Sequence, residues 1–367
     1  MIPVLSNSNT FAKKQESMKS PLVFASTIFL LFISLSSCLS QDSSLNAAGV
    51  GNGDTSRNAD SSIESDPLVN SKTASLDTAL YYEKIRHMVN GDSTGKWPVK
   101  TELPLPGAIL PFKTVIAYYG NLYSKQMGIL GELPRKQMLA RLQSEIANWK
   151  AADSTLDLQP ALHYIAVTAQ QLPGKAGKYR LRMPFHQIDS VLSMAKEIDA
   201  IVFLDIQVGL STIQNELPEF EKYLKMPNVH IGIDPEFSMK SGHAPGKVVG
   251  SYDAADINFV TNYLAKIVRE NNLPPKIFVV HRFTQKGVTN YKNIKTTPEV
   301  QIVMHMDGWG EPARKVNTYK TFIHREPVQF TGFKIFYKND VIRSKARLMT
   351  PKELLNLKPR PVYVQYQ

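Results

Sequence analysis

Carboxylates end three short apolar runs in the second half of the chain. The run at 229–237, VHIGIDPEF, closes with Asp234 and Glu236 around a proline, and two other runs contain Asp205 and Asp307. Ionisable side chains are rarely buried unless they have a partner or a chemical role. Because residues two apart on a strand share a face, we expect each carboxylate to point the same way as a polar neighbour. The sequence therefore predicts an acid–base centre made of these four carboxylates.

Cleavage of a glycosidic bond is the reaction that such a set suits best. It needs one carboxyl as general acid and a second as nucleophile or base, about 5–5.5 Å apart in retaining enzymes and about 6.5–9.5 Å apart in inverting enzymes. We expect Glu236 to be the general acid, because the adjacent Phe237 would raise its pKa, and Asp307 or Asp205 to be its partner. The side chains expected to bind substrate are Tyr118, Tyr119, Glu132, Gln207, His281, Arg282, His305 and Trp309.

Two other kinds of function stay open on the same side chains. Carboxylates and histidines could hold a metal ion for hydrolysis, but the nearest ligand-like spacing is the H-x-D of His305 and Asp307, and H-E-x-x-H does not occur. A glycan-binding protein without catalytic activity could use the same residues. A Ser/His/Asp or cysteine nucleophile is not indicated. We predict neither a metal nor another cofactor.

The elements that must position these side chains are eight apolar runs, each short enough for a buried strand. Helical patterns separate most of them, the best at 254–271 with Asp253 as its expected N-cap. This alternation predicts a single (β/α)8 barrel, whose active site lies at the C-terminal ends of the strands. A doubly wound open sheet is the alternative, but no glycine-rich fingerprint follows a run. The expected strands are 114–120, 162–167, 200–208, 229–237, 276–283, 300–310, 331–337 and 361–366.

The N-terminal segment 1–38 has the features of an export signal. It contains a basic start, an apolar stretch that is short for a membrane span, and small residues before Cys38. The sequence LSSC resembles the lipobox of bacterial lipoproteins, and either Met1 or Met18 could be the true start. That resemblance implies a lipidated Cys38 and a location in the cell envelope. Leu39 is not an acid that would retain the protein at the inner membrane, which favours the outer membrane.

Composition separates a tether from the barrel domain. Residues 39–77 are rich in Ser, Asn, Asp and Gly, which predicts a disordered tether. Residues 78–367 contain 38 lysines and arginines against 25 aspartates and glutamates, a net charge of +13. The positive charges are scattered and no nucleic-acid motif occurs, so we expect a solvated basic surface and no nucleic-acid partner. We predict a monomer without disulfides that is held to the membrane through Cys38 and binds carbohydrate.

Five stretches of the domain resemble a family of secreted or lipid-anchored (β/α)8 proteins of unassigned function. They are IAYYGNLYSKQMGILGE, VFLDIQVG, GIDPEF, VVHRF and MHMDGWG, and they span most of 114–310. The resemblance implies the barrel fold and no particular activity. The likeness to glycoside hydrolases concerns fold and site chemistry only and is an analogy.

Overall fold

The computed structural model describes residues 75–342 and 347–367, and all of these belong to one compact unit. The expected signal at 1–38, with Cys38, and residues 39–74 of the expected tether lie outside the described residues. The boundaries predicted there therefore stay predictions. Within the described ranges, no helix combines the length and the apolar character that crossing a bilayer requires.

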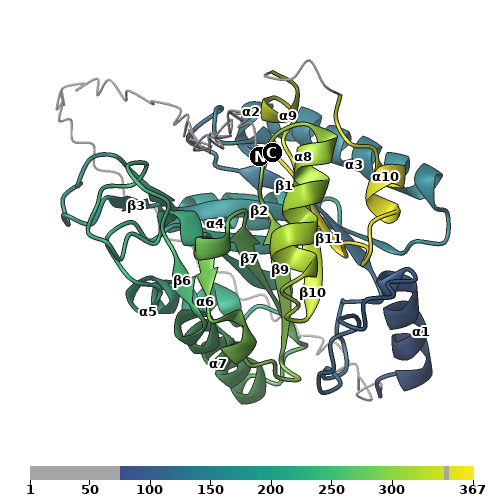
Figure 1. The fold of residues 1–367 in the computed structure, drawn as a ribbon. Coiled ribbons are helices and arrows are strands. Elements are labelled where there is room, and N and C mark those ends of the chain that lie inside the picture. The colour runs from purple at the N-terminus through teal and green to yellow at the C-terminus, as the bar shows by residue number, and fades with distance from the viewer. Residues whose placement is uncertain (1–74, 343–346) are drawn as a thin grey trace, which may run out of the picture. The chain divides into compact units, whose positions relative to one another are not determined.

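Eight parallel strands close into a barrel (Figure 1). The first strand pairs with its sequence neighbour and also with the last strand, so the sheet has no free edge among these eight. This closure confirms the predicted (β/α)8 barrel and is incompatible with the open doubly wound sheet. The barrel strands are β1 (Thr114–Gly120), β2 (Leu158–Ala169), β4 (Ile201–Ile206), β5 (Val229–Ile233), β7 (Lys276–Arg282), β9 (Val300–Met306), β10 (Phe330–Ile335) and β11 (Tyr363–Tyr366).

Helices surround the strands and connect most of them (Figure 1). The expected helix at 254–271 forms, and its N-terminus is fixed by a capping box between Asp253 and Asp256. The α-helices are α1 (Thr78–Val89), α2 (Ile129–Glu132), α3 (Arg135–Ala152), α4 (Phe185–Lys196), α5 (Ile213–Glu216), α6 (Glu221–Leu224), α7 (Ala254–Glu270), α8 (Pro312–Thr318), α9 (Asn339–Ile342) and α10 (Pro351–Leu355). Four 3-10 helices, η1 (Leu217–Phe220), η2 (Pro235–Phe237), η3 (Gln285–Gly287) and η4 (Tyr291–Asn293), and the π-helix η5 (Tyr319–His324) complete them.

Two predicted strands end four residues earlier than expected. The fourth ends at Ile233, because Pro235 has no N–H to continue a ladder and begins a 3-10 turn that Asp234 caps through its side chain. The sixth ends at Met306 rather than at Gly310. Three short strands were not predicted: β3 (Arg180–Arg182), which pairs antiparallel with β2, and β6 (Tyr252–Asp253) with β8 (Val288–Thr289), which form a separate two-stranded sheet.

Strand alternation divides the buried side chains into two cores. The outward side chains of the strands pack against the helices in the larger core, to which Trp149 of α3 belongs. The inward positions form a smaller core inside the barrel, to which Phe203 and Val303 belong. Trp97 and Leu110 join this inner core, so the proline-rich segment before β1 covers the N-terminal end of the barrel. The opposite end, where the strands reach their C-termini, is called the barrel mouth below.

Candidate functional site

The inner core changes from apolar to polar toward the barrel mouth. Barrel interiors are usually filled by branched apolar side chains, whereas the layer of this one toward the mouth carries three buried histidines, His163, His281 and His305. Two inward glycines make room for them: a Cβ on Gly232 would come within 2.5 Å of His163 Nε2, and one on Gly332 within 2.7 Å of His305 Cδ2. The inward side chains of this layer are Tyr119, His163, Asp205, His281, His305, Lys334, Tyr363 and Gln365.

Asp205 of β4 lies at the centre of this layer and is fully buried. Its Oδ2 accepts a hydrogen bond of 2.8 Å from the Tyr119 hydroxyl. Its Oδ1 is 3.3 Å from His163 Nε2 and 3.4 Å from His281 Nε2. Burial alone would raise the pKa of Asp205, but His281 and His163 hold it well below its usual value. Asp205 is therefore an ionised carboxylate enclosed by protein groups.

A line of alternating charges runs from Asp205 to β10. His281 Nδ1 is 3.0 Å from Asp307 Oδ2, and Lys334 Nζ is 3.0 Å from Asp307 Oδ1. Burial would lower the pKa of His281, but Asp205 and Asp307 raise it to about 10. Burial would raise the pKa of Asp307, but Lys334 and His281 hold it well below its usual value. At neutral pH, His281 is thus cationic and Asp307 anionic.

Asp234 and Glu236 have the opposite electrostatic environment. Burial, followed by repulsion from neighbouring carboxylates, raises the pKa of Asp234 to about 7 and that of Glu236 to about 8. Asp234 Oδ1 accepts from the Glu236 backbone N–H at 3.1 Å, and its Oδ2 accepts from Gln207 Nε2 at 3.5 Å. The Glu236 carboxyl makes no hydrogen bond or ion pair with any residue that the structure describes. At pH 7 Glu236 is mainly protonated.

Most of the predicted site residues meet at the barrel mouth. Tyr119 contacts Asp205, and Gln207 contacts Asp234. His305 Nδ1 lies 3.2 Å from His281 Nδ1. Two other predicted residues lie beyond the strand ends, Glu132 in α2 and Trp309 between β9 and α8. Glu132 pairs with Lys338 at 2.8 Å, and Arg314 lies over the Trp309 ring, 5.3 Å from its centroid.

Two expected substrate-binding residues face away from the site. Tyr118 is fully buried in the outer core, where its hydroxyl is 3.1 Å from that of Tyr337. Arg282 is 1% exposed; its guanidinium pairs with Glu326 at 2.6 Å and donates to four backbone carbonyls. Neighbouring residues on a strand face opposite sides of the sheet. Tyr118 comes one position before the inward Tyr119, and Arg282 comes one position after the inward His281. We therefore remove both from the candidate site.

Four residues of the site were not predicted. His163 Nδ1 is 2.5 Å from the Tyr363 hydroxyl, Gln365 donates to that hydroxyl at 2.9 Å, and Lys334 pairs with Asp307. They lie on β2, β10 and β11, from which no site residue was predicted, and nothing in the sequence marks which face of these strands turns inward. The sequence GDSTG at 91–95 has the G-x-S-x-G form but lies in a turn after α1, not between a strand and a helix. It is therefore no nucleophile elbow.

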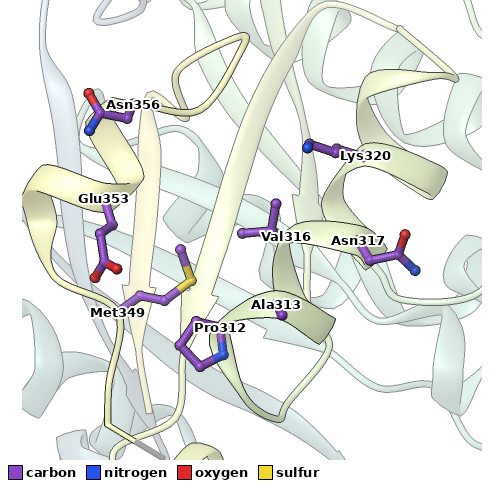
Figure 2. A pocket seen from close by; sticks show the side chains of 8 residues that line it. All are labelled: Pro312, Ala313, Val316, Asn317, Lys320, Met349, Glu353 and Asn356. Atoms are coloured by element: carbon purple, nitrogen blue, oxygen red, sulfur yellow. The ribbon is translucent and has the colours of Figure 1, made fainter.

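A surface groove lies elsewhere on the protein (Figure 2). It has a volume of about 440 Å³, and its walls come from α8 and the start of η5 on one side and from α10 and its flanking residues on the other. Its carboxylate, Glu353, caps α10 and pairs with Arg347 at 2.6 Å. None of the inward polar residues lines this groove, so the candidate site rests on the chemistry of the mouth.

Comparisons with known proteins assign no family. No protein-family model and no curated protein matches the chain. Solved structures give only weak matches. The Thermotoga maritima endoglucanase Cel5A, solved with cellobiose, is 11% identical over 69% of this chain and 89% of its own, with a TM-score of 0.38. Dihydropteroate synthase of Burkholderia cenocepacia is 10% identical over 72% and 92%, with a TM-score of 0.33.

A further match spans less than two thirds of its partner. The cellulase Cel5C_n is 11% identical over 60% of this chain and 65% of its own length, with a TM-score of 0.36. Similarities this weak carry no argument about activity, and the matched proteins themselves differ in activity. What the chain does must be argued from its own residues.

Proposed function

We propose that this chain is a glycoside hydrolase in which Glu236 is the general acid and Asp307 is the nucleophile or base. The observation that carries the proposal is the opposite protonation of two carboxyls at one barrel mouth. Glu236 has a pKa raised to about 8, whereas the pKa of Asp307 is held well below its usual value. Glycosidic cleavage needs one carboxylic acid and one carboxylate, and environments that separate two pKa values assign these roles.

The neighbouring residues support each role. Protonated Glu236 would give its proton to the glycosidic oxygen as the bond to the anomeric carbon breaks. Lys334 and His281 keep Asp307 ionised, so that it can attack the anomeric carbon or take a proton from water. Asp205 is fully enclosed by Tyr119 and the histidines, so we now prefer Asp307 over Asp205 as the partner of Glu236.

A carbohydrate-binding protein without catalytic activity is the second candidate. The ion pair between Asp307 and Lys334 favours it, because a carboxylate held by an ammonium group is a weaker nucleophile and base. In that case Asp307 would serve to orient Lys334 and His281 for binding sugar hydroxyls. The two candidates differ in one measurable property, which is turnover.

The test is hydrolysis of a panel of polysaccharides by residues 39–367 and by three variants. We expect Glu236→Gln to reduce kcat by about 10²–10⁴-fold, the usual contribution of a general acid, and Asp307→Asn to reduce it at least as much. Glu311→Gln is the matched control, because Glu311 is an exposed glutamate just beyond the mouth and should leave kcat unchanged. Binding of a polysaccharide without turnover would favour the second candidate, and full activity of Glu236→Gln would exclude the first.

We also propose that the enzyme works at the cell envelope, anchored as a monomer through lipidated Cys38 and sorted to the outer membrane. The LSSC sequence and the absence of a retention acid at Leu39 support this proposal. Labelling of cells with a palmitate analogue should mark the wild-type chain and not Cys38→Ala. Equal labelling of both chains would contradict it.

A further inference from the structure

Three buried ligand-type atoms converge at the axis of the barrel. His163 Nε2 and His281 Nε2 lie 3.3 Å and 3.4 Å from Asp205 Oδ1, and one ligand atom of each residue lies within 4.8 Å of the others. Zinc bonds to nitrogen and oxygen are about 2.0–2.2 Å long, so tetrahedral ligands stand about 3.3–3.6 Å from one another. We propose that His163, Asp205 and His281 bind one divalent transition-metal ion of the zinc class.

The polar atoms around this point are incompletely satisfied without an ion. His281 is 1% exposed, and among the described residues its Nε2 has only the 3.4 Å ion pair with Asp205 Oδ1. Asp205 uses its other oxygen, Oδ2, for the hydroxyl of Tyr119, which leaves Oδ1 for the ion. This contact is long for a buried hydrogen bond, and a metal ion between Nε2 and Oδ1 would replace the proton that Asp205 and Asp307 otherwise keep on His281.

The outer contacts of both histidines suit metal binding. A ligating histidine usually gives its second ring nitrogen to a carboxylate or another acceptor, which fixes the ring and its tautomer. His281 Nδ1 lies 3.0 Å from Asp307 Oδ2, and His163 Nδ1 lies 2.5 Å from the Tyr363 hydroxyl. In both rings the Nε2 atom is then the one directed at Asp205 Oδ1.

Glycine at 232 is required for this convergence. A Cβ at that position would come within 2.5 Å of His163 Nε2 and closer still to Asp205 Oδ1. Any larger residue would therefore separate the two ligand atoms. The sequence GIDPEF thus contributes to the site through the absence of a side chain as well as through its acids.

A second group of candidate ligands, formed by His281, His305 and Asp307, suits a cation less well. The Lys334 ammonium lies 3.0 Å from Asp307 Oδ1 and would repel a metal ion there.

The proposed ligands, two histidines and one carboxylate, are the ligand set of zinc hydrolases and of non-haem iron sites. The inference rests on the buried triad alone and does not depend on the roles proposed for Glu236 and Asp307.

The test is metal uptake by the full chain, purified in detergent without a histidine tag and stripped with a chelator. After equilibrium dialysis against micromolar Zn²⁺, elemental analysis should find one ion per wild-type chain. His163→Gln and Asp205→Asn should bind at least 100-fold more weakly. Asp307→Asn should bind about 10–100-fold more weakly, the usual effect of losing an outer partner. His186→Gln, at an exposed histidine of α4 that belongs to neither group of candidate ligands, is the control and should retain wild-type affinity.

X-ray absorption of the wild-type zinc or cobalt form needs no variant, so a variant that fails to fold leaves the proposal testable. We expect scattering from two imidazole rings and at least one oxygen, and fewer than two imidazoles would overturn the site. No uptake by the wild-type chain would also overturn it and would indicate that a protonated His281 bridges Asp205 and Asp307. Loss of binding in His305→Gln with retention in His163→Gln would overturn the choice of triad. Failure of the hydrolysis test affects none of these outcomes.

Discussion

Glu236→Gln should stabilise the protein at alkaline pH, although it removes the proposed general acid. The pKa of this carboxyl is raised from an ordinary value of 4.5 to about 8 in the folded protein. Between these two values the folded chain binds more protons than the unfolded chain, so stability falls as pH rises through this window. Each pH unit of this window is worth about 1.36 kcal/mol. Part of the raised pKa comes from Asp307 and from Asp234, which ionises only toward the upper end of the window, so we expect a loss of about 2–5 kcal/mol.

Glutamine keeps the size of the side chain and cannot ionise, so the variant avoids this loss. Urea unfolding of residues 39–367 at pH 5, 7 and 9 should show near equality of variant and wild type at pH 5. At pH 9 the variant should be more stable by about 2–5 kcal/mol. Glu311→Gln controls for the general effect of removing a carboxylate. A stability difference that is the same at pH 5 and pH 9 would refute the assignment of a partly buried, neutral Glu236.

Two further predictions concern the neighbours of this carboxyl. Lys334→Met removes the ammonium group beside Asp307, so the pKa of Asp307 should rise by roughly 1–3 units, and the acid side of the pH–rate profile should move to higher pH by the same amount. An unmoved profile would mean that Asp307 ionisation does not limit the rate. Gly232→Ala places a Cβ against His163 and Asp205 and should cost about 1–3 kcal/mol in urea unfolding, and wild-type stability would show that these side chains can move aside.

The sequence determined the strands and the acids that follow them. All eight apolar runs are strands of the barrel, because a short apolar run between amphipathic helices is buried best as a strand that those helices cover. Asp234, Glu236 and Asp307 come just after strands and therefore reach the mouth whatever the details of packing. Pro235 was visible in the sequence, and its effect, an early end to the fourth strand, could have been predicted from its missing N–H.

The sequence could not determine which of the two alternating sets of residues on each strand points toward the barrel axis. In a parallel barrel both faces of every strand are buried, so no alternation of polar and apolar residues marks the inside. For this reason Tyr118 and Arg282 were assigned to the site with their inward neighbours, while His163 was left out.

Only the closed barrel decided the chemistry of its centre. Asp205, His281, Asp307 and Lys334 come from four strands, and their charges control one another only because closure brings those strands within hydrogen-bonding distance. A pKa depends on burial and on charges a few ångströms away, and neither can be read from distance along the chain. The sequence thus provides the acids, and the tertiary structure decides which of them holds a proton.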